Sequence, residues 1–320
     1  MNVKPKVSII ICTRNRCRSL AATLRSLAQT SVAPGISCEL VVVDNGSTDE
    51  TAAVVREGSP ATMPTTLIAE PRPGQCHARN TGIRQARGEV ILFTDDDVLV
   101  PRDWVTRVAG PILTQDADAV AGGVVFDEVR RDAIERLGLG PYAGWWASTG
   151  EVDAARPERM VGANMAFARP VFEKVGPFDT NLGPGGLGFA DETLFSFQLV
   201  RAGFRLVGRL EATVTHLFDL SRLERSAILE AATRMGRSRA YLFHHWENAR
   251  SRLAFLYRHW HSMRCHYLSR SGSERINTPR FQRLLESQQS VAFCREYLIQ
   301  RRLPPRYPAR AGSALESPFS

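Results

Sequence analysis

The sequence predicts an α/β fold in which a mostly parallel, doubly wound sheet binds its ligand at one edge. Through the first 126 residues, short runs rich in Val and Ile alternate with helical segments. The runs are apolar almost throughout, as strands are when helices cover both faces of a parallel sheet. Acidic residues directly follow two of the runs, and such sheets bind ligands outside the carboxyl ends of their strands.

The composition agrees with this fold and excludes several others. The chain has 320 residues, 43% of them hydrophobic, which suffices for one large or two smaller cores without cross-links. Disordered, collagen-like and multi-span membrane proteins are thereby excluded. The six cysteines are scattered and form no C-x-x-C pair. Neither a disulfide framework nor a zinc site is indicated, and we expect a reducing compartment.

The predicted elements follow in order along the chain. The strands of the first block are expected at 7–12, 39–44, 65–70, 89–95 and 118–126, and the helices near 18–30, 49–57, 76–87 and 101–109. Residues 127–160 are irregular. The second block is expected to contain a strand near 161–168, a Gly/Pro loop at 183–188, a helix at 190–202 and short strands around 205–208 and 212–216.

The last hundred residues differ in charge and in pattern. Residues 221–320 hold 18 basic and 7 acidic residues. The net positive charge of this part therefore exceeds that of the whole chain, which is +8. Apolar residues recur three or four positions apart from 222 to 268, which predicts one long helix with an apolar seam and a basic back. Another helix is expected near 280–301, and 303–320 resembles a disordered tail. The basic surface either meets an anionic partner or is a solvated helix face.

The opening residues predict a strand rather than a targeting segment. The apolar run in MNVKPKVSIIIC is only about six residues long and no cleavage site of small residues follows it. No stretch of the chain approaches the ~20 apolar residues that span a bilayer. We therefore expect a cytoplasmic protein, with peripheral attachment to the inner face of the plasma membrane as a second option.

Carboxylates gather at the ends of two predicted strands. Asp44 ends the second strand, and the turn 45–49 that follows it offers a Ser or Thr as N-cap of the next helix. Asp95, Asp96 and Asp97 end the fourth strand. Adjacent carboxylates repel one another unless a cation neutralises them, so we expect bound Mg²⁺ or Mn²⁺. In an extended segment Asp95 and Asp97 point to the same face and reach one metal or its diphosphate ligand.

Five segments, in their order along the chain, resemble the family 2 glycosyltransferases with a GT-A fold. They are VSIIICTRNR, ELVVVDNGSTDET, PGQCHARNTGIRQARGEVILFTDDDV, VGANMAFARPVFEKVGPFDTNLG and FADETLFSFQLVRAGFRLVGRLEATVTH. The resemblance covers residues 5–218 and implies a catalytic domain over 1–220. Its nucleotide-binding half would be 1–126 and its acceptor-side half 127–220, followed by a basic helical extension over 221–302 and the tail.

The resemblance also implies where the nucleotide sugar and a metal bind. The residues that it places around the nucleotide sugar are Thr13, Arg14, Asn15, Asp44, Asn45, Arg79, Asp95 and Asp96. Asp44 would hydrogen-bond the base, and Arg79 would lie close to the diphosphate or ribose. The implied metal ligands are Asp97 and Asp95, with His216 as a further candidate. A lone histidine at a strand end is equally compatible with a structural role.

Inverting transfer needs a base that removes the proton of the acceptor hydroxyl. Asp191 matches the carboxylate proposed as base in inverting members of the family, but their Glu-Asp pair is replaced by Ala190-Asp191-Glu192. Glu192 is therefore a rival, since neighbouring residues on a helix point about 100° apart and only one can face the acceptor. The acceptor-binding candidates are Trp145, Trp146 and Asn164. Core packing is an equal alternative for the two tryptophans.

Together these features predict a metal-dependent, inverting, non-processive glycosyltransferase of cell-surface polysaccharide biosynthesis. It would move one sugar from a nucleoside-diphosphate sugar to a hydroxyl of a glycan or lipid-linked acceptor. Further expected partners are an anionic membrane surface and a second copy through helix 222–268. Nucleic acid is not favoured, because the aromatic residues follow the apolar seam. The alternatives are a sugar nucleotidyltransferase, whose Gly-rich first loop this chain lacks, and a catalytically silent binding protein with a basic tail.

Overall fold

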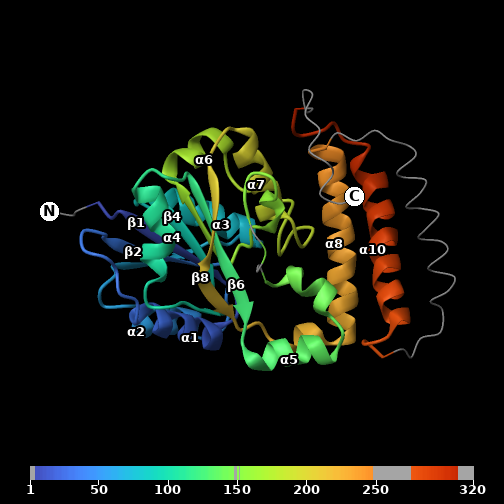
Figure 1. Ribbon diagram of the computed structural model, residues 1–320, viewed down its shortest axis with the longest axis horizontal. Coiled ribbons are helices and arrows are strands. Elements are labelled where there is room, and N and C mark those ends of the chain that lie inside the picture. The colour runs from blue at the N-terminus through green and yellow to red at the C-terminus, as the bar shows by residue number, and fades with distance from the viewer. Residues whose placement is uncertain (1–3, 148–149, 151, 248–274, 309–320) are drawn as a thin grey trace. The chain divides into compact units, whose positions relative to one another are not determined.

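A computed structural model of the protein describes residues 4–147, 150, 152–247 and 275–308 (Figure 1). By their contacts the residues form two compact units. The first unit holds Met1–Glu128, Gly144–Thr180 and Asp191–Phe218, and the second holds Val129–Ala143, Asn181–Ala190 and Asp219–Ser320. Two short segments between 127 and 220, Val129–Ala143 and Asn181–Ala190, are thus grouped with the second unit.

The first unit is built on one mixed sheet of eight strands. Its order is β3-β2-β1-β4-β7-β6-β8-β5. β1 to β4 are mutually parallel, whereas β7 runs antiparallel to both β4 and β6. The strand bounds are β1 Val7–Thr13, β2 Cys38–Asp44, β3 Thr65–Ala69, β4 Val90–Asp95, β5 Val98–Leu99, β6 Ala119–Phe126, β7 Asn164–Ala168 and β8 Leu206–His216.

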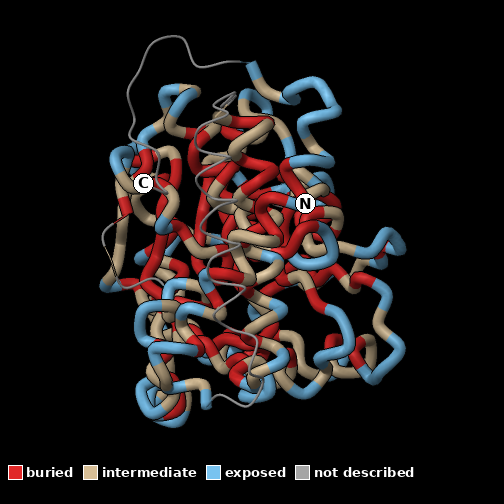
Figure 2. The backbone as a smooth tube through the Cα atoms, turned by 90° about the vertical axis from the view of Figure 1, so that its right-hand side faces the viewer, coloured by how far each residue is buried: buried red, intermediate tan, exposed pale blue. Residues whose placement is uncertain are grey.

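Helices cover both faces of this sheet, so alternate strand residues enter two different cores. In β1, Ile9 and Ile11 pack in the core that contains Trp104, whereas Ile10 packs in the core that contains Phe195. The first core takes residues from α1 (Cys17–Ala28), α2 (Thr51–Gly58) and α4 (Trp104–Leu113), and the second from α3 (Gln75–Gln85), α6 (Arg169–Val175) and α7 (Asp191–Arg201). In Figure 2 these buried stretches alternate with exposed turns. The predicted α/β fold is confirmed.

Several elements differ from their predicted form. β8 is one strand of 11 residues rather than two short ones, and it pairs with β6 across a register shift between Gly122 and Val124. Residues 127–160 contain α5 (Glu128–Arg136) and two 3-10 turns, Gly140–Trp145 and Pro157–Arg159, where the sequence suggested irregular chain. Polar residues interrupt the sequence of β8 and make up most of α5. The spacing of apolar residues therefore does not indicate either element.

Helix α2 starts later than predicted. Its first residue is Thr51, and no side chain of residues 47 or 48 caps it. The turn before α2 is held by other oxygens: Asp44 Oδ1 accepts the N–H of Ser47 at 2.8 Å, and Asn15 Oδ1 accepts the N–H of Thr48 at 2.7 Å. The expected Ser or Thr cap is therefore wrong, since the acceptors come from the strand end and from the first loop.

The second unit contains two long helices, α8 (Arg225–His245) and α10 (Pro279–Gln300), which lie side by side in Figure 1. They run parallel, because Thr233 bonds Gln288 and Arg237 pairs with Glu296 farther along both helices. The helices approach closely at Gly236, where an added Cβ would stand 2.2 Å from the carbonyl oxygen of Gln289.

The helix predicted over 222–268 ends at His245 in the structure, and residues 248–274 lie outside the described part. Three of its predicted seam residues, Ile228, Ala232 and Leu242, are buried as expected. Of the predicted tail, 303–308 is described and 309–320 is not. Among the described residues, no helix is both long and apolar enough to cross a bilayer.

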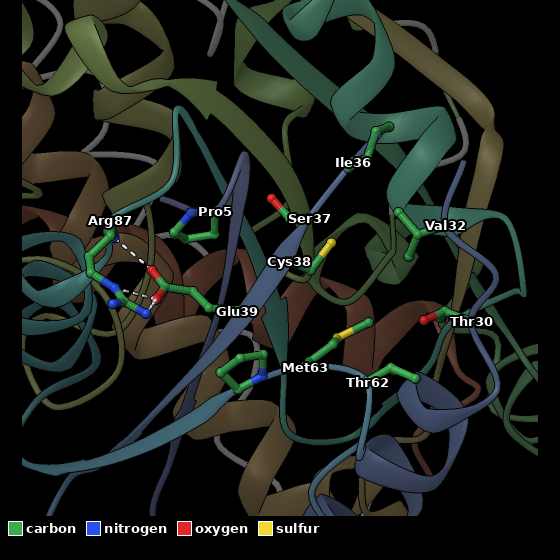
Figure 3. A pocket seen from close by; sticks show the side chains of 11 residues that line it. Pro5, Thr30, Val32, Ile36, Ser37, Cys38, Glu39, Thr62, Met63 and Arg87 are labelled. Atoms are coloured by element: carbon green, nitrogen blue, oxygen red, sulfur yellow. Dashed lines mark hydrogen bonds and ion pairs between the residues drawn. The ribbon is translucent and has the colours of Figure 1, made fainter. Parts of the chain in front are cut away.

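A cavity of 440 Å³ opens at the amino ends of β1 and β2, the edge opposite to the aspartate clusters (Figure 3). Its wall includes the buried carboxylate of Glu39, which accepts hydrogen bonds from Ser8 Oγ at 2.6 Å and from the backbone N–H of Arg87 at 2.7 Å. Burial opposes ionisation of Glu39, but these bonds and the Arg87 charge outweigh it and lower its pKa. The carboxylate is thus satisfied within the fold, and we assign it a structural role.

Candidate active site

The sheet register brings the candidate residues of the first block to one edge. Thr13 is paired with Asp44 across β1 and β2, and Cys12 is paired with Asp95 across β1 and β4. All three strands are parallel and end at these residues, so their following loops share the same edge. The edge predicted from the strand order is therefore the edge at which the carboxylates meet.

The three consecutive aspartates do not alternate as an extended strand would require. β4 ends at Asp95, and Asp96 and Asp97 lie in a turn. Arg16 Nη1 contacts both of the latter, at 3.1 Å from Asp96 Oδ1 and 2.8 Å from Asp97 Oδ2. The strand thus stops at Asp95, so the extended segment from which a shared face for Asp95 and Asp97 was expected is not present.

Arg16 is not among the site residues predicted from the sequence, which in this loop are the three residues before it. The available signal was a second arginine in the CTRNR loop, facing a run of three carboxylates. Thr13 Oγ1 also donates to Asp96 Oδ2, at 2.7 Å. Burial nonetheless raises the pKa of Asp96 to about 6. The protein thus neutralises part of its own carboxylate cluster with an arginine.

Asp95 differs from its two neighbours in its exposure. Its side chain is 26% exposed, against 6% for Asp96 and 3% for Asp97. Gln75 Nε2 donates to Asp95 Oδ1 at 3.3 Å, and Arg79 Nη2 lies 3.9 Å from the same oxygen. Burial raises the pKa of Asp95, while Arg79 acts in the opposite direction. Asp95 is therefore the carboxylate of the three that a ligand at this edge reaches directly.

His216 faces Asp97 from the end of β8. Its Nδ1 lies 2.8 Å from the carbonyl oxygen of Trp146, and its Nε2 lies 3.2 Å from Asp97 Oδ1. A carbonyl only accepts, so Nδ1 carries a hydrogen whether or not the ring is protonated. The protonated ring donates from Nε2 to Asp97, whereas the neutral ring has an Nε2 lone pair that a cation could take. Burial opposes protonation of His216, but Asp97 outweighs it and raises its pKa.

This pair fits a divalent cation in donor chemistry and in tautomer. Carboxylate and imidazole both ligate Mn²⁺ and related ions, and metal-bound histidines commonly donate their other N–H to a backbone carbonyl. Among the described residues, no three His, Cys, Asp or Glu side chains stand ready as ligands of one ion.

Arg79 joins the aspartate cluster to the start of α7. Its guanidinium is 4% exposed and forms an ion pair with Asp191, itself 3% exposed. Cys76 Sγ lies 3.5 Å from the same Asp191 oxygen, and burial keeps the pKa of this thiol well above its ordinary value. An added Cβ at Gly162 would stand 2.1 Å from Arg79 Nη2, so a larger residue at that position would require the guanidinium to shift.

The two rival carboxylates at the start of α7 have different surroundings. Asp191 is buried, and although burial opposes its ionisation, the Arg79 charge outweighs it and lowers the pKa. Glu192 is only partly buried, and its Oε1 accepts the backbone N–H of Gly162 at 3.4 Å. Burial and then the charge of Asp191 raise the pKa of Glu192 well above its ordinary value. Asp191 is held inside, whereas Glu192 is partly accessible.

The remaining nucleotide candidates divide into accessible and internally bonded residues. Arg14 is exposed and Asp44 is partly exposed. Asn45 is buried, and its amide donates to the carbonyls of Glu70 and Arg72 and accepts the N–H of Gly74 at 2.8 Å. Asn45 therefore holds the loop after β3 against the turn after β2, rather than presenting its amide to a ligand.

The structure separates the acceptor candidates. Trp146 is 2% exposed and stacks on Phe218 with ring centroids 5.6 Å apart, which supports core packing. Trp145 is partly exposed and contacts Trp146 edge to face. Asn164 has no exposed surface: it accepts from Trp104 Nε1 at 2.9 Å and donates to the carbonyls of Gly123 and Ala212. The expected acceptor contact of Asn164 is wrong, since every polar atom of its side chain is bonded inside the sheet.

Replacing Asn164 by Ala is expected to lower the free energy of unfolding by about 3 kcal/mol, because it leaves three buried polar groups without their partner. Urea unfolding followed by fluorescence measures the change. The control is Asn181→Ala, a substitution at a residue outside this network. An Asn164→Ala protein as stable as wild type but with a raised KM for acceptor would reverse the assignment.

The family model described as glycosyl transferase family 2 matches residues 8–176. Glycosyltransferase AglE of Haloferax volcanii is 31% identical over 184 residues, 57% of this chain and 59% of the relative. The succinoglycan biosynthesis protein ExoM of Rhizobium meliloti is 32% identical over 153 residues, 47% of this chain and 45% of the relative. The matches thus span less than two thirds of these curated relatives.

Solved structures share the fold over nearly the whole chain. The mannosyltransferase PcManGT from Pyrobaculum calidifontis, in complex with GDP-Man and Mn²⁺, superimposes with a TM-score of 0.59 at 19% identity, over 93% of this chain and 88% of that one. S. aureus TarS 1–349 in complex with UDP-GlcNAc gives 0.52 at 17% identity, over 93% and 92%. Because the family model matches more than half of the sequence, the chain belongs to glycosyl transferase family 2.

Proposed function

We propose that the protein transfers a single sugar, with inversion, from a nucleoside-diphosphate sugar to a hydroxyl of a glycan or lipid-linked acceptor. The observation that carries this proposal is the link made by Arg79, which lies 3.9 Å from Asp95 and pairs with Asp191 next to Glu192. Residues that suit binding of a diphosphate and carboxylates that suit acceptance of a proton thereby meet in one site. Family membership supports transfer over the nucleotidyltransferase and silent-binder alternatives.

The donor side consists of the edge formed by β1, β2 and β4. Asp44 and Arg14 are accessible polar groups at this edge that would contact the base, and Asp95 is an accessible carboxylate that would lie beside the diphosphate. Two structural relatives are complexes with nucleotide sugars, GDP-Man and UDP-GlcNAc. They support this class of donor for the chain but differ in base and sugar.

We assign the base to Glu192 rather than to Asp191. The Asp191 carboxylate is already engaged by Arg79 and Cys76, and its side chain is 3% exposed. Glu192 is the partly exposed member of the pair. As base it would accept the proton of the acceptor hydroxyl while that oxygen attacks the anomeric carbon. Asp191, acting through its neighbour, is then a positioning residue.

Asp97 and His216 would hold the divalent cation, and Asp95 would reach the same cation or its diphosphate ligand. When bound, the cation neutralises the charge that develops on the departing nucleoside diphosphate. Arg16 and Arg79 already supply fixed positive charge to the same carboxylates. One structural relative is a complex with Mn²⁺, which supports the use of a divalent cation by this chain.

Removing divalent cations with EDTA is expected to lower nucleoside-diphosphate release at least about 100-fold, because the leaving group loses its counter-charge. Added Mn²⁺ should restore the rate. As a readout independent of activity, Mn²⁺ should raise the Tm of wild type and of Asp103→Asn, a partly exposed aspartate paired with Arg107 outside the site, but not of Asp97→Asn. Full activity in EDTA, or equal Tm shifts in both variants, would contradict the metal assignment.

A thermal-shift screen of nucleotide sugars with Mn²⁺ tests the proposed function as a whole, since a ligand that binds the folded state raises the Tm. One donor should stabilise the protein and release its nucleoside diphosphate in the presence of an acceptor. If none of the common donors stabilises the protein or is turned over, the proposal fails.

A further inference from the structure

The end of helix α10 exposes large apolar side chains. Leu298 is 44% exposed, Ile299 56% and Leu303 50%. The described residues contain six exposed large hydrophobic side chains, and half of them fall within this stretch of six residues. Singly exposed apolar residues are ordinary, whereas a local cluster marks a surface that meets something apolar.

The apolar residues lie on the helix face that is turned away from α8. Positions 295, 298, 299 and 302 are spaced three and four apart and therefore share one face. The other face of α10 is buried, with Phe293 and Tyr297 packed against Ala240 of α8. The helical hydrogen bonds continue past the last residue of α10, since Arg302 N–H donates to Ile299 and Leu303 N–H donates to Gln300. Leu303 thus stays close to the same face.

The charge around these side chains has a single sign. Arg295, Arg301 and Arg302 are exposed. Between residues 290 and 308 the one acidic residue is Glu296, which is buried and pairs with Arg237 at 2.9 Å. Cations near a helix C-terminus favour the helix dipole, which accounts for arginines at this end. It does not account for leucine and isoleucine exposed between them.

We propose that this surface, which we call the α10 patch (Leu298, Ile299, Leu303, Arg295, Arg301 and Arg302), docks on an anionic lipid bilayer. Aliphatic side chains that enter the headgroup region, flanked by arginines that attract acidic lipids, are the two features that bind helices to such an interface. The proposal goes beyond the proposed reaction and does not depend on it.

Two other occupants fit the patch less well. Two copies of the chain in a symmetric dimer would bring identical patches together, so that the arginines of one patch would face those of the other. Nucleic acid would match the arginines, but its phosphates offer no contact to the aliphatic side chains at the centre. A bilayer with acidic headgroups satisfies both parts at once.

Sedimentation of the full chain with vesicles tests the proposal, using phosphatidylcholine alone and phosphatidylcholine mixed with phosphatidylglycerol. We expect binding to the mixed vesicles that weakens as salt increases and is at least about tenfold weaker without the acidic lipid. Leu298→Gln/Ile299→Gln/Leu303→Gln should weaken binding at least about tenfold. The matched control Val129→Gln/Leu220→Gln removes apolar side chains that are 59% and 43% exposed elsewhere and should bind like wild type.

The charge is tested separately with Arg295→Gln/Arg301→Gln/Arg302→Gln against Arg25→Gln/Arg56→Gln/Arg283→Gln, three arginines exposed elsewhere. Only the first set should weaken binding and reduce its salt dependence. A Tm equal to that of wild type shows that each variant is folded.

Wild type that fails to bind mixed vesicles, or patch variants that bind as tightly as their controls, would overturn the proposal. So would a dimer in size-exclusion chromatography that the triple apolar variant converts to monomer, or retention of DNA that depends on the patch arginines. No nucleotide sugar is present in these assays. A negative result would therefore reject docking on the bilayer without rejecting the proposed reaction.

Discussion

Replacing Glu192 by Gln lowers kcat for sugar transfer about 10²–10⁴-fold, the contribution of a positioned general base, while the Kd for the nucleotide sugar stays at its wild-type value. The substitution keeps the size of the side chain and the acceptor for the Gly162 N–H, but removes the group that takes the proton. Single-turnover transfer measures the rate, and titration of the donor measures binding. Glu173→Gln, a glutamate on α6 outside the site, is the matched control.

The pH profile gives the same prediction a second readout. Burial and the charge of Asp191 raise the pKa of Glu192, and a base acts only when it is deprotonated. Wild-type kcat is therefore expected to rise with pH through that raised pKa, and the residual activity of Glu192→Gln should lack this rise. Activity retained by Glu192→Gln but lost by a well-folded Asp191→Asn would show that Asp191 is the base.

Replacing Arg79 by Met is expected to lower the free energy of unfolding by about 3–5 kcal/mol, because it leaves the buried charge of Asp191 without its partner. The ion pair has both side chains below 5% exposure, so water cannot take over the role of the guanidinium. Urea unfolding at neutral pH measures the loss. Arg25→Met, on the exposed side of α1, should unfold like wild type.

The sign of the pH dependence follows from the same ion pair. In wild type, the lowered pKa of Asp191 stabilises the fold above the pKa of the unfolded chain, about 3.9, and this contribution fades as the pH falls. In Arg79→Met the unpaired buried carboxylate has a raised pKa, so acid neutralises it and relieves the penalty. The difference in stability between the two proteins should therefore shrink as the pH falls toward 4.

The double variant Arg79→Met/Asp191→Leu separates charge from packing. Replacing both partners by apolar groups should recover most of the stability, because neither charge then remains buried. The same variant should keep Glu192 but lose its alignment, which is expected to reduce kcat more than it raises KM for the donor. A single variant as unstable as the double variant would show that the loss came from packing around Phe178 rather than from the charge.

The sequence predicted the edge of the sheet at which the carboxylates meet, because strand ends and carboxylates are local features. Asp44 and Asp95 each close a run of apolar residues, and parallel strands carry such ends to one edge. The partners of these carboxylates were not predictable in the same way. Arg16 and His216 reach Asp97 from sequence separations of 81 and 119 residues, and spacing along the chain holds no signal for such contacts.

By itself, then, the sequence determined the α/β fold, the family and the edge of the sheet that carries the carboxylates. Those conclusions rest on periodicity and on short motifs, which depend only on residues close together in the sequence. Only the tertiary structure decided that Asn164 and Trp146 belong to the interior, that Asp191 is tied to Arg79 while Glu192 stays accessible, and that the end of α10 turns leucine and isoleucine outward. Burial and the choice of ion-pair partner depend on elements distant in the chain, so they are fixed only when those elements pack together.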